Sequence, residues 1–463
     1  MQLKQVNFSR SVPVIAEPDV LVVGAGCAGT AAAIVSGRRG ASTLVVERTG
    51  FAGGYITNVV GASMDGFVDL RSGLPIVGGP VFDLVRLAAR TDATGDIAHT
   101  RFRFNAELGQ MRGVMDRAFI RFDIERFKLA ADSLMLEAGV RLLYHATVAD
   151  VVRDGPRASG VLVATKAGLG MVRPRTVVDA SGDADVVAYA GAPFDLDAAT
   201  LQPMSLHFRI GSVEPTPELR DECARVLQEA HAEGRLPLYG GPWISYFDAN
   251  DLYFNATRIR GNPLDADDLS RAEVQGRRDA RLMFELFQER IPGFANSYFV
   301  TSGPMVGVRE SRRVRGESVL THEDIVAHRR RDDVVCLGGW WLDRHPTDTS
   351  GYHEHRMTRP YDIGYQTLVP RGLENVWVAG RCHSAEQAAL ASSRVTVTCM
   401  GMGQAAGTAA ALACETGAGA RELELPRLQR HLLEDGAIIL DRADEVRRVG
   451  DELGDVTIES ASR

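Results

Sequence analysis

The sequence predicts an α/β protein with a parallel central sheet, and three observations lead to this prediction. Asp19-Val-Leu-Val-Val-Gly24 is a short apolar run typical of a buried strand, and 43–47 is a second such run. A glycine-rich loop and a helix-forming stretch, 30–39, separate the two runs. Residues 175–179 and 375–378 repeat the buried-strand pattern much later in the chain. Strands that alternate with helices in this way predict a Rossmann-type domain.

The glycine-rich loop has the pattern G-x-G-x-x-G directly after the first strand. Gly24 allows the sharp turn, Gly26 lets the backbone touch a pyrophosphate, and Gly29 permits close packing of helix on strand. The N-terminus of the helix then presents free N–H groups to the phosphates. Glu47 ends the second strand, close to the ~20 positions at which an acid is expected to bind a ribose. The segment predicts a dinucleotide site, and Glu47 argues against NADP, whose extra phosphate needs a basic residue.

A second glycine-rich loop, Gly50-Phe-Ala-Gly53-Gly54, follows Glu47 and Arg48. It would bring the chain close to the same pyrophosphate from the other side, which a domain that binds only NAD does not need. An acid followed by such a loop resembles FAD enzymes of the glutathione-reductase-like superfamily. The resemblance implies FAD as the cofactor.

Later blocks of the sequence strengthen this resemblance. Val-Val-Asp179-Ala-Ser-Gly182-Asp183 and Val-Trp-Val-Ala-Gly380-Arg381 are similar to the superfamily's later FAD-binding strands. Residues 304–324, with Arg309-Glu-Ser-Arg-Arg, resemble a block of a large bacterial family of FAD-dependent oxidoreductases related to the fumarate reductase and succinate dehydrogenase flavoproteins. A helix with a glycine-rich start at Gly401 would direct its positive end at the flavin. The resemblance covers residues 18–417.

The cofactor residues that these blocks imply come from four loops, one helix and a middle strand. We expect FAD to contact Gly24, Ala25, Gly26, Ala28, Gly29, Glu47, Arg48, Gly53, Gly54, Val148, Ala180, Gly182, Asp183, Gly380, Arg381, Met402, Gly403 and Gln404.

The expected domain organisation is a glutathione-reductase-like FAD domain with an inserted α+β substrate domain. We expect the FAD domain at 15–60, 116–199 and 358–420, and the inserted cap at 61–115 and 200–357. Residues 421–463 are expected to form a helical tail. The run 395–414 is apolar, but its polar residues and glycines favour a buried helix over a membrane span.

Composition narrows the function classes. The formal net charge is −8 and no block of basic residues is present, which argues against nucleic acid as a partner. The six cysteines form no C-x-x-C pair, and the chain has one dinucleotide fingerprint, so a disulfide reductase is disfavoured. The N-terminus has no apolar leader, and we expect a cytoplasmic enzyme with a small-molecule substrate. The sequence does not decide whether the protein forms a homo-oligomer.

Arginines are the first candidates for substrate contacts, because the flavin itself carries the redox chemistry. Arg309, Arg312 and Arg313 would each suit a carboxylate. The alternative is an internal ion-pair network with Glu310 and Glu317.

Histidines are the candidates for the accompanying proton transfer. His353 and His355 lie in a polar loop before the last FAD segment, and His383 follows Gly380-Arg381. We take Arg309, His353 and His383 as catalytic candidates, with a solvated loop as the alternative for His353. His207 is expected to be a packed or surface histidine. No third ligand accompanies the paired histidines, so no metal is expected.

The function that these observations favour is two-electron dehydrogenation or oxidation of a small organic substrate by hydride transfer to flavin N5. A flavin monooxygenase that uses NAD(P)H and oxygen is one alternative. It is disfavoured because related aromatic hydroxylases usually show Gly-Asp where this chain has Gly380-Arg381. A non-enzymatic flavin-binding protein is the other alternative.

Overall fold

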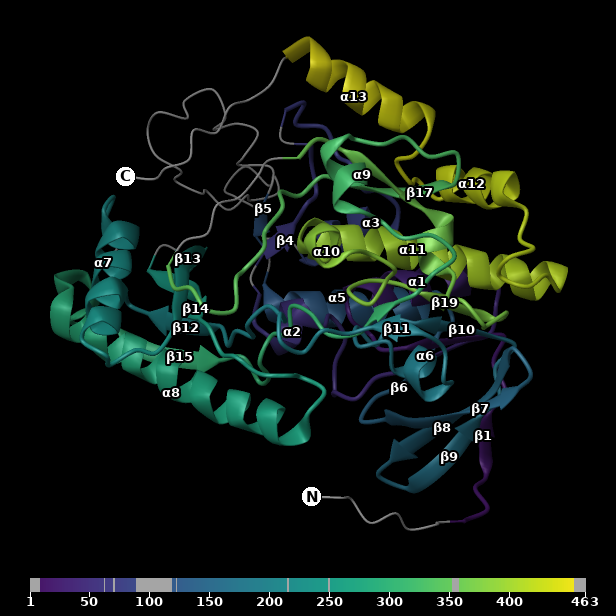
Figure 1. Ribbon diagram of the computed structural model, residues 1–463, viewed down its shortest axis with the longest axis horizontal. Helices are drawn as coiled ribbons and strands as arrows, with labels where there is room; N and C mark the ends of the chain where they lie inside the picture. The colour runs from purple at the N-terminus through teal and green to yellow at the C-terminus, as the bar shows by residue number, and fades with distance from the viewer. Residues whose placement is uncertain are drawn as a thin grey trace.

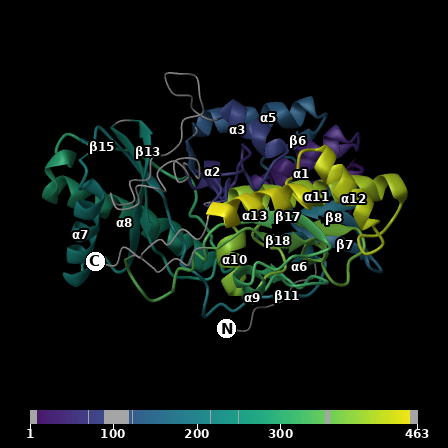
Figure 2. The same ribbon diagram turned by 90° about the horizontal axis from the view of Figure 1, so that it is seen from above.

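The computed structural model describes residues 9–453, except 62, 70, 89–118, 122, 215, 249 and 352–357. Figure 1 shows two lobes, and Figure 2 shows the same division from above. The larger lobe contains a five-stranded parallel sheet, and the smaller one contains an antiparallel sheet with two helices.

The five-stranded sheet confirms the predicted fold class. Its strand order is β19-β10-β2-β3-β6, and every neighbouring pair is parallel. The β-branched and leucine side chains of the central strands are buried on both faces, as a parallel sheet requires. The strands are β2 (Val20–Val23), β3 (Thr43–Val46), β6 (Arg141–Leu143), β10 (Thr176–Asp179) and β19 (Val376–Val378).

Alternate residues of each strand enter two different cores. Val20 and Val22 pack in the core that contains α1 (Cys27–Arg38) and α11 (Thr396–Thr416). Leu21 and Val23 enter the second core, on the other face, beside a mixed sheet with the order β1-β9-β8-β7, in which β1 pairs with β9 in parallel and the other neighbours are antiparallel. This sheet consists of β1 (Val14–Ala16), β7 (Thr147–Asp154), β8 (Arg157–Thr165) and β9 (Gly168–Val172).

The smaller lobe, which we call the cap, confirms an inserted α+β unit. Its sheet has the order β13-β14-β12-β15 and packs on α7 and α8 around a core of phenylalanines. These elements are β12 (Phe208–Gly211), α7 (Leu219–Ala232), β13 (Tyr239–Asp248), β14 (Asp251–Thr257), α8 (Ala266–Arg290) and β15 (Tyr298–Ser302).

The cap is smaller than the sequence predicts. Helix α3 (Pro80–Ala88) packs on α1, α5 and α11, and β17 (Val334–Gly338) packs on α11. Helix α12 (Leu425–Glu434), in the predicted helical tail, buries Leu428 and Leu432 in the same core, so it is part of the larger lobe. These segments belong to the larger lobe because their apolar side chains pack against its helices, even though their position in the chain predicted the cap or the tail.

The remaining elements connect these layers. They are α2 (Tyr55–Asn58), β4 (Ser63–Asp65), β5 (Phe119–Arg121), α5 (Ile124–Glu137), α6 (Asp185–Tyr189), β11 (Phe194–Asp195), η1 (Pro292–Phe294), β16 (Arg313–Val314), α9 (His322–Val326), β18 (Tyr361–Gly364), η2 (Tyr365–Leu368), α10 (Gln387–Ser393) and α13 (Asp441–Leu453). Among the helices in the described ranges, none has the length and apolar character to cross a bilayer.

Candidate active site

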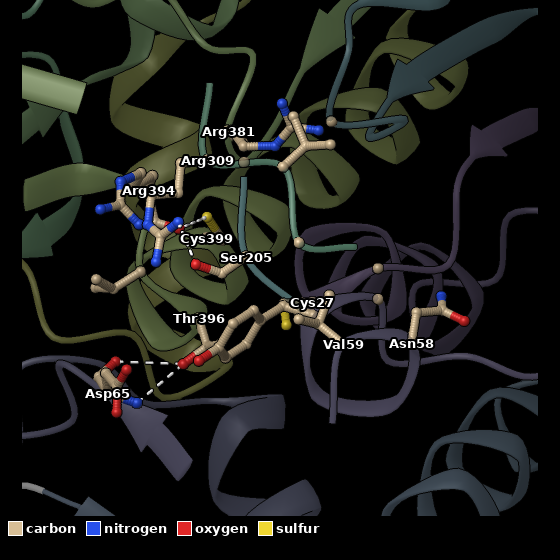
Figure 3. Close-up of a pocket in the computed structure, with 18 of the residues that line it drawn as sticks. Cys27, Asn58, Val59, Asp65, Ser205, Arg309, Arg381, Arg394, Thr396 and Cys399 are labelled. Atoms are coloured by element: carbon tan, nitrogen blue, oxygen red, sulfur yellow. Dashed lines mark hydrogen bonds between the residues drawn. The ribbon is translucent and has the colours of Figure 1, made fainter. Parts of the chain in front are cut away.

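A large cavity lies where the parallel sheet meets the cap (Figure 3). It encloses about 1870 Å³ of empty space, open solvent at its mouth included. The loops that follow β2, β3, β10 and β19 line one part of it, and all four begin at the carboxyl ends of their strands. Ligands of open parallel sheets bind at this edge. The rest, which we call the cap side of the cavity, is lined by residues of the cap strands and by parts of the segments 55–65, 305–309, 340–345 and 394–399.

The loop after β2 has the geometry of a pyrophosphate cradle. Gly24 has φ +88°, and a Cβ on it would lie 2.6 Å from the carbonyl oxygen of Ala180. Gly54 has φ +53°, and its Cβ would lie 2.8 Å from the Cα of Gly26, so the two loops touch through bare backbone. Gly26 is also the N-cap of α1 and provides no side chain to its free N–H groups. These N–H groups are available to a phosphate, and the residues fit the pyrophosphate of FAD.

Glu47 connects the cradle to the predicted ribose position. It is buried and lines the cavity. Its Oε2 accepts a hydrogen bond from the N–H of Ala25 at 2.7 Å, and its Oε1 accepts from the N–H and hydroxyl of Thr49, both at 2.8 Å. The carboxylate therefore also holds the glycine loop in place.

The structure brings many of the predicted cofactor residues to the cavity. Those that line it are Gly24, Gly26, Ala28, Glu47, Arg48, Gly54, Ala180, Gly182, Gly380 and Arg381. The others support it from behind or lie elsewhere in the core. Those are Ala25, Gly29, Gly53, Val148, Asp183, Met402, Gly403 and Gln404.

Three of these supporting residues have clear packing roles. A Cβ on Gly29 would lie 1.8 Å from the carbonyl oxygen of Gly24, so Gly29 allows helix and strand to pack closely. Val148 is buried in β7, within the second core. Asp183 accepts a hydrogen bond from Nη2 of Arg381 at 2.7 Å.

The start of α11 differs from the prediction. The helix begins at Thr396 and not near Gly401, so Thr396 and Cys399 line the cavity in place of Met402–Gln404. Gly403 packs on α1, because its Cβ would lie 2.0 Å from the carbonyl oxygen of Ala28. The sequence signal at 401–407 is that of a helix–helix contact. The helix N-terminus still lies at the cavity, one turn earlier than expected.

The positive charge of Arg381 is neutralised by Asp183. Besides Asp183, Arg381 donates from Nη1 to the hydroxyl of Ser311 at 2.9 Å. Burial alone would raise the pKa of Asp183, but Arg381 and Ser311 outweigh burial and hold this pKa below its ordinary value. The pair joins the loop after β10 to the loop after β19 across the cavity wall.

The three arginines of the 309–313 block have different roles. Arg312 pairs with Asp185 at 3.0 Å, and Arg313 pairs with Glu310 at 2.6 Å. These two arginines therefore form internal ion pairs, which was the alternative to binding a substrate carboxylate. Glu317, the second expected partner, pairs with Arg421 instead. Arg309 lines the cavity, and its acceptors among the described residues are all neutral.

Of the two histidines expected to be catalytic, His383 is the one that the structure describes, and it does not line the cavity. His383 is fully buried, its Nδ1 lies 2.9 Å from the carbonyl oxygen of Gly380, and burial lowers its pKa to about 4. It is absent from the cavity wall and supports the loop that carries Arg381. His353 lies outside the described residues. His207, expected to be a packed or surface histidine, is buried but lines the cavity, and its ring meets that of Tyr55 edge-on at 5.5 Å.

Sequence reasoning missed several polar residues of the cap side. Asp343 and His345 line the cavity, and Oδ2 of Asp343 lies 3.1 Å from Nε2 of His345. They come shortly after Trp340 and Trp341, which also line the cavity, with ring centroids 4.0 Å apart. A tryptophan pair followed by charged residues after a buried strand is the signal that was available. The further members of this set are Tyr55, Ser205, Asn255 and Arg394.

The fold and the cavity together define a class, the flavoproteins that bind FAD on a Rossmann-type domain beneath an inserted cap. Comparison of the sequence with known families agrees. The chain belongs to the FAD-dependent oxidoreductase family, whose pattern matches residues 19–432. The protein is therefore an oxidoreductase with FAD as its cofactor. The predicted relation to fumarate reductase flavoproteins stays a prediction.

Individual relatives are distant. A thiamine thiazole synthase of Archaeoglobus fulgidus is 25% identical over 252 residues, which are 50% of this chain and 84% of that protein. A geranylgeranyl bacteriochlorophyll reductase-like protein from Thermoplasma acidophilum is 12% identical with a TM-score of 0.46, and covers 96% of this chain and 94% of its own. A p-nitrophenol 4-monooxygenase from Pseudomonas putida is 13% identical with a TM-score of 0.45, and the match covers 95% of this chain and 94% of that protein. At these scores, none of the relatives' reactions transfers to this chain.

Proposed function

We propose that the protein is a dehydrogenase or oxidase that removes two electrons from a small organic substrate held between FAD and the cap. The observation that carries this proposal is the continuous cavity. One part is the nucleotide cradle around Gly26 and Glu47, and the cap part is lined by titratable residues that include His345. Bound FAD supplies the two-electron acceptor. The protein's own residues must bind the substrate, exclude water and take up the proton.

His345 is suited to accept that proton. Burial lowers its pKa well below the ordinary value, so the ring is neutral at pH 7. Oδ2 of Asp343 accepts a hydrogen bond from Nε2–H of His345, which fixes the orientation of the ring and would stabilise its protonated form. His207 is also neutral, because burial lowers its pKa to about 3, but no carboxylate is among its bonded partners.

The walls of the cap side exclude water from the substrate. Trp340 and Trp341 are 4% and 5% exposed, and burial raises the pKa of Tyr55 far above its ordinary range, so its hydroxyl stays protonated. Apolar walls with a few polar groups are typical of small-molecule sites.

The proposal is tested by anaerobic reduction of the FAD-loaded protein, followed as bleaching of the flavin absorbance during a screen of amines, alcohols and hydroxy acids. With a substrate found, His345→Gln should slow bleaching about 10²- to 10⁴-fold while FAD remains bound. His431→Gln is the matched control, because His431 also contacts a carboxylate, Glu434 at 3.0 Å, but lies on α12, outside the cavity wall. Equal rates for the two variants would exclude His345 as the proton acceptor.

The alternatives give different results in the same assay. A monooxygenase would show bleaching by NADH or NADPH, and substrate-dependent oxygen uptake afterwards. A flavin that neither an organic substrate nor NAD(P)H reduces would support a non-enzymatic flavoprotein.

A further inference from the structure

The cap side of the cavity contains a cluster of buried guanidinium groups. Arg258 and Arg309 are 2% and 8% exposed, and both donate from Nη1 to the hydroxyl oxygen of Ser205 at 2.8 Å. Both also donate to Oδ1 of Asn255, at 3.1 Å from Arg258 and 3.5 Å from Arg309. The two cations thus share the same neutral acceptors. Figure 3 shows Arg309 beside Ser205, with Arg394 close by.

Neither of these two cations has a carboxylate partner within the described residues. Arg394 lies 3.4 Å from Asp343, and that carboxylate is shared with His345. The remaining bonds of Arg309 and Arg258 go to the carbonyl oxygens of Pro203 and Thr257, respectively. Two like charges side by side with no carboxylate within ion-pair distance are costly in a protein interior, although the charge of Asp343 acts to raise the pKa of both arginines. Burial and the neighbouring arginines lower the pKa of Arg309, and burial lowers that of Arg258 to about 10.

Arg258 also retains unused donors. Its Nε and Nη2 are buried and donate to no acceptor in the described part of the chain. Gly240 on β13 makes room for this guanidinium, because a Cβ there would lie 2.1 Å from its Cζ. Both atoms are shielded from the cavity, whose wall does not include Arg258, so this guanidinium adds positive potential behind Arg309 and does not contact a ligand directly.

We infer that this cluster binds a carboxylate group of the substrate, with Arg309 at the cavity wall and Arg258 behind it. The inference deepens the proposed function and rests on it. A planar carboxylate matches the fork of a guanidinium and supplies the missing negative charge. The tryptophan pair and Tyr55 form the apolar walls beside it. The substrate class is therefore a small organic acid whose apolar part packs on the aromatic side chains.

The inference is tested with benzoate and benzamide, which have the same ring and nearly the same shape but differ in charge. Each is titrated into the FAD-loaded protein at pH 7 and followed by perturbation of the flavin absorbance. Benzoate should bind roughly 10- to 100-fold more tightly than benzamide, the effect of hydrogen bonds to a charged group. Arg309→Gln should lose about tenfold or more of the benzoate affinity and leave benzamide unchanged, whereas Arg309→Lys should retain part of the preference.

The matched control is Arg290→Gln. Arg290 is a cation of the same lobe, but it pairs with Glu233 at 2.9 Å, away from the cavity wall, and its removal should change neither affinity. Equal binding of benzoate and benzamide to the wild-type protein would overturn the inference, and this comparison needs no variant to fold. Tighter binding of inorganic phosphate than of any carboxylate would also overturn it. So would an Arg309→Gln protein that loses FAD affinity but keeps its preference for benzoate.

These outcomes separate the inference from the proposed function. A protein that is reduced by neutral substrates and shows no carboxylate preference keeps the proposed function and loses the inference. A protein that prefers benzoate but whose flavin no substrate reduces loses the proposed function.

Discussion

Glu47 is the residue whose removal tests most directly how the cofactor loop is held. Glu47→Ala removes the acceptor of three hydrogen bonds, one from the N–H of Ala25 and two from Thr49. Ala25 is fully buried, so water cannot replace its lost partner, whereas Thr49 is half-buried and water can reach it. One buried unpaired donor costs about 1–3 kcal/mol, and the Thr49 bonds contribute less. We expect the free energy of unfolding of the FAD-free protein to fall by about 2–4 kcal/mol.

The same substitution should weaken FAD binding separately. Loss of a charge-assisted hydrogen bond to the ribose costs about 1–3 kcal/mol of affinity. Glu47→Gln keeps one carbonyl oxygen as an acceptor and should fall between Glu47→Ala and the wild type in both measurements.

Two assays measure the two effects. Chemical denaturation of the FAD-free protein gives the unfolding free energy, and quenching of flavin fluorescence during titration gives the affinity. Asp83→Ala is the control, because it removes a surface carboxylate that pairs with Arg38 and Arg86, and it should cost less than about 1 kcal/mol. If Glu47→Ala behaves like Asp83→Ala in both assays, Glu47 neither holds the loop nor binds the ribose.

Three further predictions follow from the packing of the larger lobe. Gly403→Ala should lower the free energy of unfolding, measured by thermal denaturation, by more than about 3 kcal/mol, because the new Cβ meets the backbone of α1. Gly40→Ala is the control: its Cβ meets open space, so it should lower the free energy of unfolding by only about 1–2 kcal/mol, through backbone strain. The buried His383, whose pKa burial lowers to about 4, takes up a proton on unfolding, so its contribution to stability is present above pH 6.5 and is lost as pH falls toward 4. His383→Asn should remove up to about 3 kcal/mol of that pH dependence, measured by denaturation at pH 7 and pH 4.5; an unchanged slope would contradict the neutral buried ring. All six cysteines are free and buried, so a thiol reagent should label them slowly in the native protein and completely after unfolding; rapid native labelling would show an accessible thiol.

Local sequence order predicted the nucleotide half of the site well. Gly24, Gly26 and Glu47 lie where expected, because a strand, a tight turn and a helix start are defined by neighbours in the chain. The backbone conformation that Gly24 adopts, with φ +88°, is one that side chains other than glycine rarely take, so the residue type itself reveals the turn.

Glycines in helices were harder to interpret. The pattern at 401–407 resembled a helix start, but Gly403 and Gly407 serve the contact between α11 and α1. A glycine that a cofactor approaches and a glycine that another helix approaches look the same in sequence. The distinction needs the partner, which is more than 350 residues away in the chain.

The substrate half of the cavity was decided by tertiary structure. Arg309 was recognised as a candidate, but its distinction from Arg312 and Arg313 depends on which carboxylates lie within reach in the fold. Arg258 comes from the end of β14 and Ser205 from the segment before β12, and antiparallel pairing of these two strands brings them together. By itself, the sequence determined the FAD cradle, whose residues are close together in the chain. The charge cluster of the cap side is assembled from segments far apart, and only their pairing in the folded protein brings together two guanidinium groups without an ion-pair partner among the described residues, with Arg309 at the cavity wall.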